Sequence, residues 1–186
     1  IKYPSGKQDE SFSIPATVTA VNANSFDNCS HLQSINVGKD VTSIVNTAIV
    51  NCQKLKSFTV DSENIQFKSV DDVLFTFDMT QIVKYPSGKI DEFYSIPSDV
   101  TTINLYAFNT CNYLKTVTAG DNLITINANA FANCENLETV TVGNQLITIA
   151  ASAFANCVSL RSLTVESNKV DGPKVTNTGL IGASAF

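Results

Sequence analysis

Five cysteines are the residues of this 186-residue chain best suited to nucleophilic or metal chemistry. Cys29 and Cys52 are 23 residues apart, and the same interval separates Cys111, Cys134 and Cys157. A zinc site needs Cys and His ligands clustered about two to four residues apart, and no such cluster is present. The even spacing instead predicts one interior thiol per repeat, as a small hydrophobic residue. Free thiols are favoured because the count is odd, although stacked rungs about 4.8 Å apart do not exclude disulfides by distance.

The other candidates for chemistry are a histidine, two acidic pairs and a glycine turn. His31 is the only histidine, so any catalytic triad would have to use it. It occupies a variable position, which favours an exposed residue. The acidic pairs at 71–72 and 91–92 are interpreted as solvated turns, because a calcium site needs more oxygen ligands. Lys-Tyr-Pro-Ser-Gly-Lys lacks the spacing of a phosphate-binding loop. We predict no catalytic, metal or cofactor site.

Composition narrows the class of protein further. Hydrophobic residues make up 44% and charged residues 16% of the chain, which indicates a folded protein. The net charge of −5 without clustered Lys or Arg argues against nucleic acid as a partner. No apolar run approaches the ~20 residues that span a bilayer, so no direct membrane insertion is expected in this segment. The sequence begins within a recognisable unit, and we expect it to be a fragment of a longer chain.

The cysteine interval belongs to an internal repeat. Five units begin near residues 18, 41, 100, 123 and 146, and a truncated sixth begins near 178. They share the pattern [VL]-x-x-[IV]-x-x-x-[AS]-[FI]-x-x-C-x-x-L-x-x-[IVFL]-x-[VA]. Such repeats predict a solenoid, in which each unit buries its apolar face only against its neighbours. The whole of 1–186 is therefore predicted to be one solenoid segment.

A longer duplication accompanies this repeat. Lys-Tyr-Pro-Ser-Gly-Lys occurs at 2–7 and 84–89, and Ser-Ile-Pro occurs at 13–15 and 95–97, both with an offset of 82 residues. This offset predicts two ordinary units plus an insert over 61–99, with residues 1–17 as the tail of an earlier insert. Within the insert, apolar runs at 73–77 and 81–85 flank Asp-Met-Thr, a pattern that predicts a β-hairpin.

The residue pattern predicts the same local structure for every repeat unit. Alternating apolar and polar residues at 137–142 and their counterparts indicate a half-buried strand. A second short extended piece carries Ile126, and Asn-Ala-Asn-Ala-Phe-Ala-Asn-Cys suits a 3₁₀ or short helical turn. The [FI] position of the repeat pattern should form an internal spine, which comprises Phe26, Ile49, Phe108, Phe131 and Phe154.

The motif I-x-x-x-A-F-x-x-C-x-x-L-x-x-I-x-[LIV], present from Ile126 to Val142, resembles the BspA-like, or Treponema-type, class of leucine-rich repeats. The resemblance covers nearly the whole chain, with Ile49 in place of the usual Phe. It implies an α/β-type leucine-rich-repeat solenoid that is right-handed and β-rich. Parallel strands would lie on one face, joined by 3₁₀ or short helical turns, with an inserted hairpin. It also implies a surface or secreted protein that binds other proteins in adhesion.

The exposed positions of the predicted strands are the candidate partner-binding face. Nearly every strand offers two small polar residues beside a charged or amide residue. The face comprises Gln33, Ser34, Asn36, Lys56, Ser57, Thr59, Lys115, Thr116, Thr118, Glu138, Thr139, Thr141, Arg161, Ser162 and Thr164. These residues would also suit a merely solvated sheet or, by ordering water, an ice-binding face. The hairpin, with Phe75, Phe77 and Met79, is a second candidate contact, unless it packs back onto the solenoid.

Three functions stay open. A non-enzymatic protein–protein interaction module, part of a surface or secreted adhesion protein, is the prediction. An intracellular structural scaffold of a large assembly is the alternative, because reduced cysteines favour a cytoplasmic, reducing compartment. An enzyme that uses the insert as a lid, with His31 or Asp72, is the third.

Overall fold

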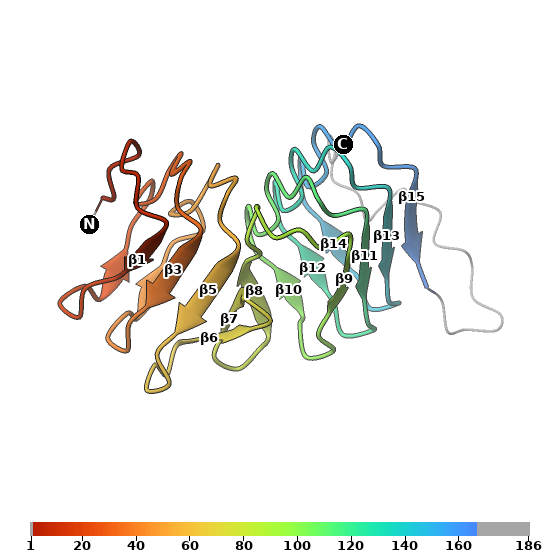
Figure 1. Cartoon of the computed structure of the whole chain (residues 1–186). Coiled ribbons are helices and arrows are strands. Elements are labelled where there is room, and N and C mark those ends of the chain that lie inside the picture. The colour runs from red at the N-terminus through yellow and green to blue at the C-terminus, as the bar shows by residue number, and fades with distance from the viewer. Residues whose placement is uncertain (1, 167–186) are drawn as a thin grey trace.

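The computed structural model describes residues 2–166, which form a β-solenoid of about seven turns (Figure 1). One strand from each turn lies on the same face, which we call the main face. In chain order these strands are β1 (Ser11–Ser13), β3 (Ser34–Val37), β5 (Ser57–Val60), β9 (Phe93–Ile96), β11 (Thr116–Ala119), β13 (Thr139–Val142) and β15 (Ser162–Val165). They pair in parallel in two groups, β1-β3-β5 and β9-β11-β13-β15.

A second set of strands lies on another side of the solenoid. The short strands are β2 (Ala20–Val21), β4 (Ser43–Ile44), β8 (Gln81–Lys84), β10 (Thr102–Ile103), β12 (Thr125–Ile126) and β14 (Thr148–Ile149). The parallel pairs of two-residue strands are in register at the repeat interval, as in Ile103 beside Ile126, whereas β8 pairs with β10 two residues short of it. Two further strands, β6 (Phe67–Val70) and β7 (Val73–Thr76), pair antiparallel with each other, and β7 pairs antiparallel with β8.

The prediction of 3₁₀ or short helical turns, and with it the α/β description, is wrong. Residues 2–166 contain no helix. The turn that precedes each cysteine contains residues with positive φ, and a right-handed helix cannot include them. Six of the nine such residues are asparagine, which adopts this conformation at the lowest cost after glycine. With φ between 52° and 61°, they are Asn24, Asn28, Asn51, Tyr106, Thr110, Asn129, Asn133, Ser152 and Asn156.

The predicted internal spine is confirmed. All five of its members are buried, and Phe108, Phe131 and Phe154 stack with centroid separations of 4.6 and 5.2 Å and interplanar angles of 12° and 6°. Tyr85 stacks on Phe108 at 5.1 Å, and Tyr3 stacks on Phe26 at 5.9 Å. The duplicated tyrosine therefore begins each stack, and the segment that carries it is part of the solenoid interior.

The cysteines occupy the predicted interior column as free thiols, four of them buried and Cys157 partly buried. Three of the thiols donate to the backbone of the preceding turn. Cys52 Sγ lies 2.8 Å from Phe26 O, and Cys134 Sγ lies 2.9 Å from Phe108 O. The thiol is thus a weak donor to a buried carbonyl, which gives this position a reason to be cysteine.

The solenoid is interrupted by a seam between its second and third full repeat units. Neither β5 and β9 nor β4 and β8 pair with each other. The predicted hairpin, confirmed as β7–β8, lies between two separate hydrophobic cores. Val73, Phe75 and Ile82 pack into the C-terminal core, whereas Leu74 and Val83 pack into the N-terminal core. Period-two alternation along β7 and β8 therefore joins the two halves.

The segments expected to be inserts largely follow the solenoid path. β8 pairs with β10, and β9 pairs with β11, so residues 81–96 form a full turn, which we call the Tyr85 turn. Additional structure is limited to residues 61–80, which contain β6 and β7. At the N-terminus, β1 pairs with β3, and Tyr3 donates its N–H to Ser25 O. The truncated unit expected near 178 lies outside the described residues.

The Tyr85 turn is two residues shorter than its neighbours. Tyr85 follows Ile82 by three residues, whereas Phe108 follows Ile103 by five. Ile82 is nevertheless equivalent to Ile103 in the fold, and Tyr85 is equivalent to Phe108. The shorter path draws residues 82–88 into the interior, where all of them are buried. Gly88 replaces cysteine, and its backbone lies against the backbone of Gln53 and Lys54.

Gly88→Ala should lower the free energy of unfolding by about 1–3 kcal/mol, because an added Cβ would overpack this contact. That atom would lie 2.6 Å from Gln53 O and from the carbonyl carbon of Lys54. Gly120→Ala is the matched control, since no atom lies within 4 Å of its added Cβ. Urea denaturation of both variants measures the difference. Equal effects of the two substitutions would contradict the described packing.

Candidate functional site

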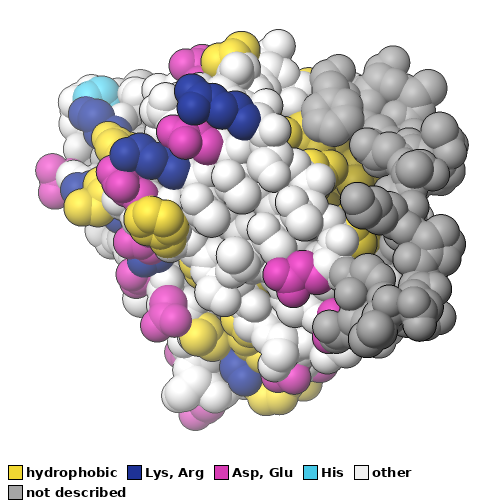
Figure 2. Space-filling model, turned by 90° about the vertical axis from the view of Figure 1, so that its right-hand side faces the viewer, with side chains coloured by type: hydrophobic (Ala, Val, Ile, Leu, Met, Phe, Trp, Pro, Cys, Tyr) yellow, Lys and Arg dark blue, Asp and Glu magenta, His cyan; other side chains and the backbone are white. Residues whose placement is uncertain are grey.

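The structure brings the predicted partner-binding residues together on the main face. Ser34 pairs beside Ser57, and Thr116 beside Thr139, so the hydroxyl-bearing side chains form columns across the strands. The inner column is partly buried and comprises Ser34, Ser57, Thr116, Thr139 and Ser162. The outer column is mostly exposed and comprises Asn36, Thr59, Thr118, Thr141 and Thr164. Figure 2 shows a broad area of side chains that are neither hydrophobic nor charged, bordered by a row of mixed positive and negative charge. The predicted face is therefore contiguous within each of the two strand groups.

The charged residues of this face form a third column, along the N-terminal ends of the strands. Lys56 Nζ donates to Gln33 Oε1 at 3.1 Å, and Lys115 Nζ lies 2.8 Å from Glu92 Oε1. The hydrogen bond to Glu92 raises the pKa of Lys115. These exposed pairs contribute little to stability. They do fix the charge pattern that a partner would meet.

The sequence prediction omitted a residue near the centre of this face. Phe93 is in register with Thr116, and its side chain is 71% exposed. It is the aromatic member of a column that otherwise carries Ser and Thr, from Ser11 to Ser162. The duplicated Glu-x-x-Ser-Ile-Pro at 10–15 and 92–97 could have identified it, because the first copy aligns with the repeat strands.

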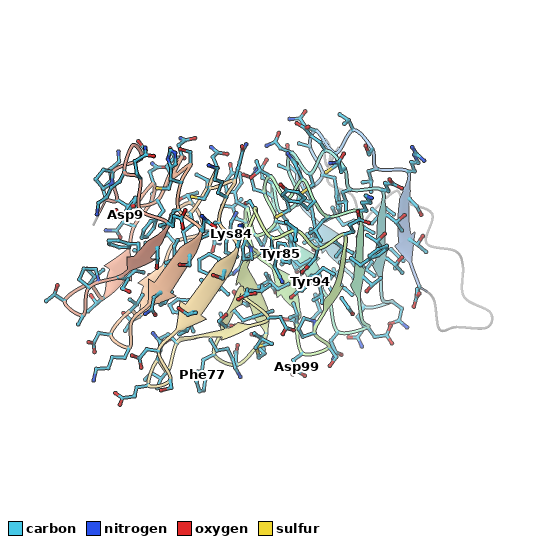
Figure 3. The ribbon with its side chains drawn as sticks, viewed as in Figure 1. Asp9, Phe77, Lys84, Tyr85, Tyr94 and Asp99 are labelled. Carbon is cyan, nitrogen blue, oxygen red and sulfur yellow. The ribbon has the colours of Figure 1, made fainter. Side chains whose placement is uncertain are left out.

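A hollow of about 260 Å³ lies where the sheet is interrupted, between β5 and β9, and is lined by Lys56, Asp72, Gly88, Lys89, Ile90 and Asp91. The tip of the β6–β7 hairpin closes part of the interruption, since Phe58 donates its N–H to Asp72 O at 2.9 Å. Lys89 pairs with Asp91 at 2.8 Å, and Tyr85 Oη donates to the same carboxylate at 3.3 Å. Burial and Asp91 raise the pKa of Tyr85. Tyr85 and Tyr94 lie together in the C-terminal core, with ring centroids 4.9 Å apart (Figure 3).

The hairpin offers less contact surface than expected. Phe75 is fully buried in the C-terminal core, so its assignment as a contact residue is wrong. Phe77 is 50% exposed, with Lys68 Nζ 5.6 Å from its ring centroid. Met79 has positive φ and is partly buried. Only Phe77 presents a large apolar surface, at the outer end of the hairpin (Figure 3).

The residues considered for catalysis or metal binding do not form a site. His31 is partly exposed, and its Nδ1 lies 3.2 Å from Ser30 Oγ. Asp71 and Asp72 have positive φ and make the tight turn between β6 and β7. Within residues 2–166, no group of three or more His, Cys, Asp or Glu could hold a metal ion. The same residues include no helix long and apolar enough to cross a membrane.

Comparisons with known proteins agree on the repeat class. The family model described as "BspA type Leucine rich repeat region" matches residues 5–95 and 85–174, in six copies. No curated protein sequence matches the chain at a significant level. The solved structures considered below resemble it at 21–22% sequence identity, a level that shows the fold alone.

Three of these structures are bacterial surface or repeat proteins. A leucine-rich repeat protein from Eubacterium ventriosum has a TM-score of 0.65, with 83% of this chain and 55% of that chain covered. A leucine rich cell surface protein from Faecalibacterium prausnitzii has a TM-score of 0.51, with 92% and 64% covered. The pneumococcal vaccine antigen PcpA has a TM-score of 0.53, with 89% and 51% covered. The chain thus spans about half to two thirds of the length of these proteins.

Proposed function

The chain belongs to the BspA-type leucine-rich repeat family, and on that premise we propose that it is a protein-binding module whose partner docks on the main face around Phe93. The family is generally a non-enzymatic interaction module. The observation that carries the proposal is the exposed aromatic ring of Phe93 on β9, the first main-face strand after the sheet interruption. Large aromatic residues near the centre of an interface supply much of its binding energy.

The surroundings of Phe93 suit protein docking. Ile90, which lines the hollow at the sheet interruption, is 71% exposed. Two exposed large apolar side chains therefore lie three residues apart in the chain, one in the turn before β9 and one on β9 itself. Desolvation of Ser and Thr costs less than desolvation of ion pairs, so the hydroxyl columns can flank an apolar centre at low cost. Lys56, Lys89 and Asp72 at the edge of the hollow supply charges that can set the orientation of the partner.

The descriptions of two similar structures, a cell surface protein and a vaccine antigen, support a location at the cell surface. An intracellular scaffold is the second candidate, and the free cysteine column favours it, because thiols persist in reducing compartments. Antibody labelling of intact and permeabilised source cells discriminates between them. Labelling of intact cells supports the surface location, and labelling only after permeabilisation supports the scaffold.

Phe93→Ala should weaken partner binding by about thirtyfold or more, the effect of losing an interface residue worth about 2 kcal/mol. The measurement is surface plasmon resonance of the chain against a panel of purified extracellular matrix proteins. Phe77→Ala is the matched control, since it removes a half-exposed ring from the hairpin tip. Thr118→Arg, in the outer column, should also block binding. Failure of every panel protein to bind, or binding that neither main-face variant changes, would contradict the proposal.

A further inference from the structure

The short path of the Tyr85 turn leaves a trough on the side of the solenoid that carries the cysteine turns. Residues 82–88 are all buried, whereas the flanking turns keep their full length and leave residues such as Val45, Asn51 and Tyr106 partly or fully exposed. Two hollows follow the recessed turn, with volumes of about 260 and 410 Å³. The larger has Gln53 and Lys54 on one wall, Ser87 at its base, and Asn112 and Tyr113 on the other wall. Its size is that of a small-molecule site.

The floor of the trough is fixed by bonds between turns. Lys84 Nζ donates to Tyr106 O at 2.8 Å, and Ser87 Oγ donates to Asn109 O at 3.0 Å. Both side chains are nearly fully buried. They link the recessed turn to the following turn through side chains. The trough is therefore held in shape without a ligand, which lowers the entropic cost of binding one.

The chemistry of the walls is neutral and rich in hydrogen-bonding groups. Amides and hydroxyls make up almost the whole lining of both hollows, with Lys54 as the one charged residue and Val50 as the one aliphatic residue. No carboxylate, histidine or cysteine lines either hollow, so a metal ion lacks ligands there. One ammonium group is a poor match for a multiply charged anion, which needs clustered donors. A hydrophobic peptide would find no apolar pocket.

Several groups in the larger hollow can face a ligand. Asn136 Nδ2 donates to Asn112 O at 2.7 Å, and Asn112 Oδ1 accepts the N–H of Glu135 at 3.2 Å. These two bonds leave the side-chain Nδ2 of Asn112 as a donor and the side-chain Oδ1 of Asn136 as a neighbouring acceptor. Tyr113 is 51% exposed, and its ring forms part of the same wall. Gln53 adds a further amide with both donor and acceptor capacity.

From this geometry we propose that the trough binds a neutral carbohydrate, at the level of a mono- or disaccharide unit. Adjacent sugar hydroxyls each donate and accept, so they match an amide donor beside an amide acceptor. The apolar C–H face of a pyranose ring matches the exposed face of Tyr113. The two hollows of the trough share no lining residue with the hollow at the sheet interruption and do not include Phe93, so each proposal can fail without the other.

The test is ¹H–¹⁵N NMR titration of the full 186-residue chain with lactose, maltose, cellobiose and N,N′-diacetylchitobiose at millimolar concentrations. At least one of these sugars should shift the signals of Gln53, Asn112 and Tyr113, and the shifts should saturate as the sugar concentration rises. Tyr113→Ala should weaken that affinity at least tenfold, while Tyr113→Phe should retain most of it. Because the side chain is half exposed, the alanine variant should keep the melting temperature of the parent, which separates lost binding from lost folding.

Phe93→Ala is the matched control, because it alters the main face and should leave sugar affinity unchanged. Inorganic phosphate forms the second arm. Shifts at Lys54 with phosphate and none with the four sugars would assign an anion site and overturn the proposal. Absence of any shift, or shifts that map away from the trough, would also overturn it.

Discussion

Phe131→Ala is expected to lower the free energy of unfolding by about 3–5 kcal/mol, the range for a phenylalanine removed from a packed core. Its ring is fully buried between Phe108 and Phe154, stacked at 4.6 and 5.2 Å. The substitution removes the buried area of one ring and both of its stacking contacts. Little relaxation is available, because each turn is held in register by parallel pairing on two sides of the solenoid.

Urea denaturation followed by circular dichroism measures this effect. Because each turn contacts only its neighbours, damage at Phe131 should spread along the C-terminal core rather than across the seam. Hydrogen exchange should therefore increase first at β11, β13 and β15. Phe77→Ala is the control, with an expected change within about 0.5 kcal/mol, since that ring is half exposed. A loss at Phe131 below about 1 kcal/mol would be incompatible with a continuous ring stack.

The repeat made most of the fold predictable. A fixed interval between cysteines places equivalent residues one above another, so burial of the ring spine and exposure of the Ser/Thr columns follow from a single alignment. Alternation of apolar and polar residues then identifies the main strands. Periodic burial is thus the property that sequence reports most directly. Prediction of the exposed position of Phe93 would have required an alignment of its turn with the other repeats, and that turn has no cysteine on which to align.

The Tyr85 turn shows why that alignment was missed. Its cysteine position is Gly88, and it lacks two residues between Ile82 and Tyr85, so the cysteine pattern does not detect it. Both changes have one cause, the recessed path against the backbone of Gln53 and Lys54. Residues of this turn line the hollow at the sheet interruption and the larger hollow of the trough. The sequence prediction treated the turn as part of an insert over 61–99, so neither hollow was predicted.

The error over helical turns has a different origin. Asn-Ala-Asn-Ala-Phe contains no residue that forbids a helix, and alanine favours one. Stacking decides otherwise, because Phe131 donates its N–H to Ala153 O in the next turn and Asn133 donates to Ala155 O. Bonds between turns replace bonds within a helix. Asparagine adopts positive φ at a low energetic cost, which permits the non-helical turn. The regular recurrence of asparagine in the sequence could have indicated such a turn.

Alkaline pH is expected to destabilise the protein steeply, beginning near the pKa of an unfolded thiol. A hydrogen bond with Cys52 and burial raise the pKa of Cys29. Burial raises the pKa of Cys134 well above its usual value, and a hydrogen bond with Cys134 raises the pKa of Cys157. A group with a raised folded pKa contributes its stability fully below the unfolded pKa and loses it as pH rises. The loss therefore begins near pH ~8.5, where unfolded cysteine ionises.

Two buried groups act in the opposite direction. A hydrogen bond with Cys29 lowers the pKa of Cys52, and burial lowers the pKa of Lys84. A lowered folded pKa adds stability as pH rises from the folded to the unfolded pKa, which is about 8.5 for a thiol and about 10.4 for a lysine. Each proton contributes about 1.4 kcal/mol per pH unit. Cys52 no longer offsets the loss above the unfolded thiol pKa, so three thiols with raised pKa values outnumber Lys84 and the free energy of unfolding should fall with pH above ~9. Above that range Tyr85 and Tyr94, whose pKa values are raised chiefly by burial, add to the loss.

Urea titrations in the presence of a reductant, from neutral pH to about pH 10.5, measure this profile. Cys134→Ala should reduce the slope by about 1.4 kcal/mol per pH unit, because one of the three raised thiols is removed. Lys84→Met should instead steepen the decline, because it removes a group whose lowered folded pKa offsets the loss from the thiols. Opposite changes in slope from two neighbouring buried groups are difficult to produce by general alkaline damage. A free energy of unfolding that stays constant from pH ~8.5 to ~10 would mean that these thiols ionise equally easily in the folded and unfolded chain.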